Sequence, residues 1–345
     1  MRAENAKNDG NGRGEGRMVK VSYRVTFDTP AFLGNAEQSG QWRTPPFKHL
    51  LREWWRVAWA ERNDPRDWRR MREMEGKLFG HAWLENDHDS EGGAVSARRS
   101  PVRLRLTPWK AGGLTGLPKT RPVATKAPAS GLYLGYGPVR GATKLKMRHP
   151  VNEGESAQLQ LAWPKMHAGA EYMERMLALI HAFGTLGGRS RNGWGSLALS
   201  GDGLPVLEGA PLRDWRDCLR EEWSHAIGAD DRGALVWRTQ KLRTEWKSVI
   251  EDLGPIRKQV NGWVSRKERE MINQPVGGRG GRLPNTLRFK VRHDEKDPEK
   301  LYGLIFHMPC KPPEGFRLNV NSPVQVWQKV HGLLDGHEGL KRGGV

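Results

Sequence analysis

The chain has 345 residues and a formal net charge of +18, with 57 lysines and arginines against 39 aspartates and glutamates. Its two cysteines lie far apart, which excludes a disulfide scaffold and a zinc site built from cysteines. No apolar run reaches the roughly 18 residues that cross a membrane. The polar start, residues 1–17, lacks the apolar segment of a secretion signal and is expected to be disordered. We therefore expect a cytoplasmic protein whose partner is a polyanion, nucleic acid first, with a merely soluble basic protein as the alternative.

The first half of the chain predicts the order strand, helix, strand, strand, helix, strand. Strict alternation of apolar and polar residues predicts the first strand at 19–27, and a helix follows over 47–61 behind two prolines. The later elements are strands at 102–106 and 158–163, a helix at 170–183 and a strand at 194–199. This order is the ferredoxin-like arrangement of many RNA-binding domains, and we assign it to residues 18–203.

The second half repeats this plan less clearly. Strands are predicted at 234–238, 286–292 and 301–308, and helices at 240–252, 256–272 and 324–334. A final strand is not visible. We therefore predict an α+β protein with two ferredoxin-like domains in tandem, the second, residues 204–345, being decorated or incomplete. Its GGRGGR segment at 277–282 is either an RNA contact or a disordered connection.

A long basic insertion, about residues 109–152, separates the second and third predicted strands. Residues 92–152 contain twelve lysines and arginines and no acid. The densest cluster consists of Arg140, Lys144, Lys146 and Arg148, beside Tyr133 and Tyr136. Cations with neighbouring aromatic rings favour a track for single-stranded RNA, although a solvated loop is the alternative.

A glycine-rich segment, GGRSRNGWGS at 187–196, joins the second helix to the last strand of the first domain. Arginine suits bidentate phosphate contacts, serine and asparagine suit phosphate or sugar, and tryptophan suits stacking or packing. The candidate RNA-binding residues are Gly188, Arg189, Ser190, Arg191, Asn192, Gly193, Trp194 and Gly195. The alternative is a helix cap followed by a plain turn, with the tryptophan in the core.

The predicted helix at 47–61 has two different faces. One face is apolar and is assigned to the core. The other carries Lys48, Arg52 and Arg56 beside Trp55 and Trp59. Exposed tryptophans usually need a partner, so this face is predicted to contact RNA or a neighbouring subunit.

Signals for catalysis are weaker. Asp87, His88 and Asp89 are adjacent, but without ligands elsewhere they favour a solvated loop over a metal site. His49 could act as a base on a ribose 2′-hydroxyl, although no second acid or base is visible. Neither a metal nor a cofactor is expected.

The segment GGRSRNGWGSL resembles the glycine-rich loop of the RAMP superfamily of CRISPR-Cas proteins. Residues 27–61 resemble the opening of the large tandem-domain subunit of type III-B (Cmr) effector complexes, where a TP-x-FLG start precedes a KxxLRxWWR helix. KLFG at 77–80 and the KAPASGLYLGYGP segment are also similar. The resemblance is strong over 27–199 and weak beyond.

This resemblance implies a non-catalytic subunit of a type III RNA-targeting effector complex that holds the 3′ part of the guide RNA (crRNA). The implied partners are the crRNA, other RAMP subunits and, as a further candidate, the target RNA. The alternative is a metal-independent endoribonuclease that processes guide precursors with His49 as its base.

Overall fold

The computed structural model describes residues 17–82, 84, 87–88, 91–141, 143–265, 268, 272, 285–311 and 323–343. The predicted disordered start, apart from Arg17, and the arginine-rich loop at 277–282 lie outside these residues. Within the described ranges, none of the helices is long and apolar enough to cross a membrane.

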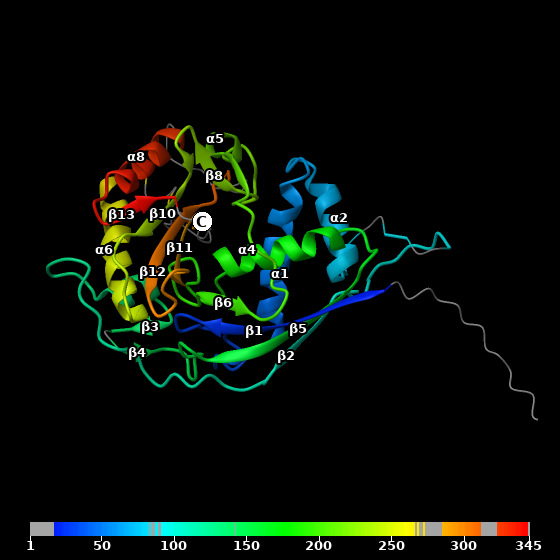
Figure 1. The fold of residues 1–345 in the computed structure, drawn as a ribbon, viewed down its shortest axis with the longest axis horizontal. Helices are drawn as coiled ribbons and strands as arrows, with labels where there is room; N and C mark the ends of the chain where they lie inside the picture. Colours follow the sequence, from blue (N-terminus) through cyan, green and yellow to red (C-terminus); the bar gives the residue numbers. More distant parts are fainter. Residues whose placement is uncertain are drawn as a thin grey trace, which may run out of the picture.

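The first sheet has four antiparallel strands in the order β2, β5, β1, β6. These strands are β1 (Met18–Phe27), β2 (Arg103–Thr107), β5 (Ser156–Pro164) and β6 (Leu197–Ser200). Two helices, α1 (Thr44–Ala60) and α4 (Met173–Phe183), cover one face of this sheet (Figure 1). The alternation in β1 places Tyr23, Val25 and Phe27 beneath those helices, whereas Lys20, Ser22 and Arg24 are exposed. The topology is ferredoxin-like, as predicted.

A second sheet repeats this topology, with strand order β11, β12, β10, β13. Its elements in chain order are β10 (Val236–Thr239), α6 (Trp246–Trp263), β11 (Leu287–His293), β12 (Leu301–His307), α8 (Pro323–Asp335) and β13 (Leu340–Arg342). The fourth strand, which the sequence did not reveal, is therefore present. The two helices predicted at 240–252 and 256–272 are a single helix, α6, that continues through Pro255.

Shorter elements decorate the two repeats. α2 (Trp68–Phe79) follows α1, and the insertion contains α3 (Ser130–Gly135), β3 (Val139–Arg140) and β4 (Lys144–Leu145). The link between the repeats forms a small sheet of β7 (Leu212–Asp214), β8 (Ile227–Asp230) and β9 (Gly233–Ala234) with the short helix α5 (Trp215–Cys218). The second repeat is thus complete and decorated.

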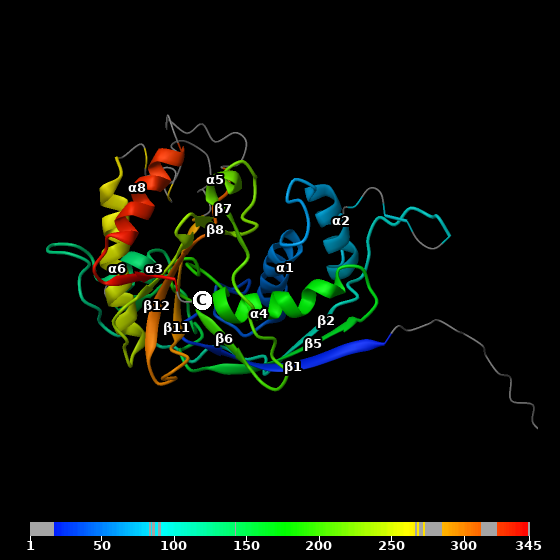
Figure 2. The same cartoon turned by 45° about the horizontal axis from the view of Figure 1, so that its top comes forward.

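The second sheet is buried on both faces. Figure 2 shows β11 and β12 between the pair α6 and α8 on one side and α4 on the other. Phe306 of β12 contacts Phe183 of α4, with ring centroids 5.1 Å apart, whereas Ile305 belongs to the cluster formed with α6 and α8. Every residue of β12 is therefore buried, and the strand reads as a continuous apolar run rather than an alternating one.

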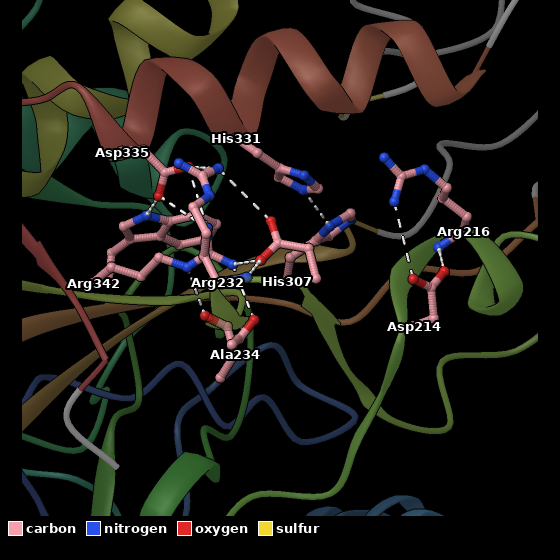
Figure 3. Close-up of polar contacts among 11 residues, drawn as sticks. Asp214, Arg216, Arg232, Ala234, His307, His331, Asp335 and Arg342 are labelled. Carbon is pink, nitrogen blue, oxygen red and sulfur yellow. Dashed lines mark hydrogen bonds and ion pairs between the residues drawn. The ribbon is translucent and has the colours of Figure 1, made fainter.

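The last strand, β13, is held by a network of ion pairs (Figure 3). Arg342 pairs with Asp230 of β8 and, at 3.3 Å, with Asp335 of α8, and it also donates to the carbonyl of Ala234. Arg232 approaches the Asp335 carboxylate to 2.5 Å, and the Trp237 indole donates to the same group at 2.9 Å. These contacts explain how a strand of only three residues is fixed at the sheet edge.

A buried histidine pair lies beneath α8 (Figure 3). His307 Nδ1 and His331 Nε2 are 2.9 Å apart, and His307 Nε2 is 3.2 Å from the Thr286 hydroxyl. Burial lowers the pKa of His331 to about 3 and places the pKa of His307 well below its ordinary value. Both rings are therefore neutral in the folded chain at neutral pH.

This pair predicts a specific sensitivity to acid. Below pH ~6.5 the two histidines bind protons in the unfolded chain but not in the folded chain. The free energy of unfolding is therefore highest above that pH and falls as the pH is lowered toward about 3. The expected loss approaches about 1.4 kcal/mol per pH unit for each histidine. Urea unfolding of the parent and of His331→Gln at about pH 7 and about pH 5 measures it. The variant should lose less stability on acidification, and His49→Gln, which removes an exposed histidine, serves as the control. Equal losses in the parent and His331→Gln would contradict the assignment.

Candidate nucleic-acid interface

The insertion folds into a short basic hairpin, defined here as residues 139–148. β3 pairs with β4 in antiparallel fashion, with Val139 opposite Leu145 and Arg140 opposite Lys144. The four predicted RNA-binding cations of this hairpin, Arg140, Lys144, Lys146 and Arg148, are all exposed. None of them forms an ion pair within the described part of the chain. Because like charges placed opposite each other destabilise a strand pair, this arrangement favours an anionic ligand.

The body of the molecule holds the hairpin at several points. Val139 is buried in the same apolar cluster as Leu134 of α3 and Trp194 of the glycine-rich segment. Lys146 N–H donates to the Pro138 carbonyl at 2.7 Å, and Gly40 N–H donates to the Arg148 carbonyl at 2.7 Å. The exposed cations are thus presented on a backbone that the rest of the molecule anchors.

The first part of the glycine-rich segment lies beside this hairpin. Gly188 N–H donates to the Phe32 carbonyl at 3.0 Å, and Asn192 N–H donates to the Arg189 carbonyl at 2.9 Å, which closes a turn. A Cβ added at Gly137 would lie 3.4 Å from the Arg189 guanidinium. Arg189 is therefore at the base of the hairpin, and the partly exposed Ser190 follows it.

The second part of the segment is partly buried at Arg191 and Asn192, fully buried from Gly193 onward, and joins the two repeats. Asn192 donates to the Leu134 carbonyl at 3.1 Å and accepts from Asn285 at 3.2 Å. Phe289 N–H of β11 donates to the Arg191 carbonyl at 3.0 Å, and the Ser196 hydroxyl accepts from Val291 N–H at 2.9 Å. The segment consequently works as a structural joint as well as a candidate RNA contact.

This burial corrects the prediction for three residues. Gly193, Trp194 and Gly195 are buried, so they are not available to RNA in this structure. The centroid of the Trp194 ring lies 5.2 Å from that of Phe32 and 5.6 Å from that of Trp246. The ring is therefore part of the core, which was the alternative to a stacking role. Gly195 has φ +62 and an added Cβ would be 1.9 Å from the Leu186 carbonyl oxygen, so close backbone packing requires this glycine.

Arg191 belongs to a charged cluster between the repeats. It lies 3.9 Å from Glu53 of α1, and the buried Arg288 of β11 pairs with the same carboxylate at 2.8 Å. The neighbouring Arg288 and burial lower the pKa of Arg191 to about 10. Burial opposes ionisation of Glu53, but the two arginines still lower its pKa below the ordinary value. The Arg191 guanidinium therefore interacts with Glu53 in this cluster, although its side chain is 36% exposed.

The polar face of α1 is covered in a way that the sequence did not reveal. Arg52 and Arg56 both bond to Glu75 of α2, at 2.9 and 2.8 Å. Trp55 and Trp59, expected to be exposed, are fully buried, and the Trp55 indole donates to the Gly169 carbonyl at 2.8 Å. The missed element is α2, which its own sequence signals through the N-cap Asp67 and the helical spacing of Met71, Met74 and Leu78.

Arg52 and Arg56 nevertheless border an open groove of about 920 Å³ between α1, α2 and the link that follows α5. Trp68 and Arg220 also line this groove, together with the acidic Glu221 and Glu222. Lys48, one turn before Arg52 on α1, does not line this groove; it is half-buried, and burial together with Arg52 lowers its pKa. The three predicted α1 cations are therefore not gathered with the hairpin cations.

The candidates for catalysis are placed apart from one another. His49 is exposed on α1, one turn before Glu53, whose carboxylate is bound by Arg288. Asp87 is buried and pairs with His81 at 2.7 Å and Arg98 at 2.6 Å, so it is not part of a solvated loop. Asp89 lies outside the described residues. No group of three or more metal-ligating side chains occurs among the residues that the structure describes.

Comparisons with known proteins give one structural match to report. No protein-family model matches the chain, and no curated protein matches its sequence. The fold is similar to the crystal structure of Cmr1 from Pyrococcus furiosus in its apo form, with a TM-score of 0.46 and 14% sequence identity. The match covers 94% of this chain and 98% of that chain. A function for the surface therefore has to be inferred from the side chains of this chain.

Replacing one buried and one exposed tryptophan tests which ring contributes to the stability of the fold. Trp194→Ala should lower the free energy of unfolding by about 3–5 kcal/mol, because it removes a fully buried ring at the joint. Trp109→Ala removes a ring that is 59% exposed and should change stability by less than about 0.5 kcal/mol. Chemical denaturation followed by circular dichroism measures both variants. Equal stability of Trp194→Ala and the parent would show that the ring is not part of the core.

The hairpin predicts a defined dependence on salt. In Lys144→Gln/Lys146→Gln, the slope of log affinity for single-stranded RNA against log salt should fall by about 1.4, because each phosphate contact contributes roughly 0.7. Lys241→Gln/Lys296→Gln removes the same charge from exposed positions of the second repeat and is the matched control. Fluorescence anisotropy over a salt series measures the slopes. Identical slopes for the two double variants would remove the hairpin from the interface.

Proposed function

We propose that this protein is a non-catalytic crRNA-binding subunit of a type III CRISPR effector complex and holds the 3′ part of the guide. The observation that carries the proposal is the anchored basic hairpin, whose four exposed cations form no ion pair among the described residues. Arg189 at its base extends this surface toward the glycine-rich segment that resembles the RAMP loop. The tandem ferredoxin-like topology supports the same assignment.

The chemistry of the hairpin fits a nucleic-acid backbone. Lysine and arginine side chains bind phosphate with little dependence on base identity, so the surface suits a guide whose sequence differs from one complex to the next. The exposed Tyr136, three residues before the hairpin, adds a ring on which a base can stack. The role requires neighbouring RAMP subunits in the cytoplasm, and the α1–α2 groove with Arg52 and Arg56 is the candidate surface for one of them.

Copurification tests the proposal directly. The tagged protein, expressed in cells that contain a type III system, should copurify with crRNAs and other RAMP subunits, identified by RNA sequencing and mass spectrometry. Ultraviolet cross-linking should join peptides of residues 139–148 to the 3′ half of the guide. Cross-links confined to the 5′ half would contradict the position, and recovery without crRNA would contradict the function.

The non-catalytic part has a separate test. The purified protein should leave guide precursors intact in the presence of EDTA. Cleavage that produces 2′,3′-cyclic phosphate ends, and that is lost in His49→Ala, would favour the endoribonuclease alternative instead.

A further inference from the structure

The open face of the first sheet carries a second basic surface. This face turns away from α1 and α4, and its outward residues are polar or small. Across the three strands β2, β5 and β1 they include Lys20, Ser22, Arg24, Arg103, Arg105, Thr107, Gln158, Gln160 and Ala162. None is acidic, and the four cations form no ion pair in the described portion of the chain. We refer to this surface below as the open sheet face.

The strand register places these side chains in rows across the sheet. Arg105, Gln160 and Ser22 lie abreast on β2, β5 and β1. Arg103 and Lys20 flank Ala162 in the adjacent row, where the small side chain leaves a hollow of about 400 Å³. Cations at both borders and amide or hydroxyl groups between them form a shallow polar channel across three strands.

This face is continuous with the basic hairpin. β2 leads directly into Trp109, which is 59% exposed, and Lys110, whose side chain is 53% exposed and lies 3.8 Å from the Glu155 carboxylate. Trp42 N–H donates to the Lys110 carbonyl at 2.9 Å, and Gly40 N–H donates to the Arg148 carbonyl at 2.7 Å. The segment of residues 40–42 therefore lies between the chain that follows β2 and the end of the hairpin. An extended ligand that binds both surfaces would run from Arg105 past Trp109 to Arg148.

The composition of the open sheet face favours nucleic acid over a protein partner. Protein interfaces are depleted of charge at their centres and enriched in apolar and aromatic side chains. Here the central strand contributes glutamine and alanine and no aromatic ring, and burying the bordering arginines and lysine against a neutral protein would cost desolvation energy without compensation. A phosphate backbone supplies the missing charge and stays partly hydrated, and Trp109 offers a stacking surface at the edge.

We propose that the open sheet face is an RNA-binding track that extends the hairpin site, with single-stranded RNA as its ligand. This inference rests on the proposed function, because it assigns additional length to the same bound strand. RNA held only at the hairpin would span a few nucleotides, whereas RNA that follows both surfaces would be substantially longer.

Dependence on RNA length tests the proposal. Binding of oligouridines of about 6 and about 20 nucleotides is measured by anisotropy for the parent, Arg103→Gln/Arg105→Gln and Lys144→Gln/Lys146→Gln. The sheet variant should bind the long RNA about tenfold more weakly, with a salt slope lower by about 1.4, and should bind the short RNA like the parent. The hairpin variant should lose affinity for both lengths. Trp109→Ala should weaken only the long RNA.

The outcomes separate the two proposals. Unchanged affinity of the sheet variant for the long RNA, with loss in the hairpin variant, would overturn the sheet track and leave the proposed function intact. Absence of RNA binding by the parent would overturn both. Lys241→Gln/Lys296→Gln controls for net charge, and an equal loss in that variant would overturn the assignment to this surface. Cross-linking of β1 or β2 to a protein subunit, with no RNA cross-link in the assembled complex, would show that a protein occupies the face.

Discussion

The architecture depends on a buried lysine that joins the two repeats. Lys290 of β11 is fully buried and donates to the carbonyls of His181 in α4 and Leu197 in β6, at 2.9 and 2.8 Å. Burial, reinforced by Arg292, places its pKa well below the ordinary value. A buried amine requires hydrogen-bond partners, and both come from the other repeat. The position of β11 against the first repeat is therefore fixed by polar groups as well as by apolar packing.

The candidate RNA surface follows from this constraint. Backbone N–H groups of β11 donate hydrogen bonds to the glycine-rich segment. The second half of the segment is therefore held between the repeats, and the first half lies beside the hairpin. Arg288, on the same face of β11 as Lys290, binds Glu53 and with it orients Arg191. Residues that looked uniform as a glycine-arginine stretch consequently have two roles. The split between Ser190 and Arg191 is set by contacts more than 90 positions away, such as that with Asn285.

Local patterns in the sequence were sufficient for the four strands and two helices of the first ferredoxin-like unit, because its strands are half-buried and its helices are amphipathic. They failed for β13, since three residues are too few for a periodic signal and the strand is fixed by Arg342 and its distant acids. They also failed for Trp55 and Trp59, because the cover provided by α2 is tertiary. The hairpin cations could be identified from charge alone, since no acid occurs nearby in the sequence. The open sheet face was visible as alternation in β1 and β2, but its continuity with the hairpin depends on pairing through residues 40–42.

The burial of the second sheet on both faces also affects how the chain can fold during synthesis. α4 ends at Phe183, but its contact with β12 can form only after Leu301 has been synthesised. The second sheet is complete only when β13, which begins at Leu340, has been added. The first repeat therefore leaves the ribosome with a large apolar surface that has no cover until much later. Apolar surface exposed in this way favours aggregation and chaperone binding, and ribosome pausing before β12 would prolong its exposure. The two repeats resemble separate modules in topology, but the apolar cover of the first depends on the second.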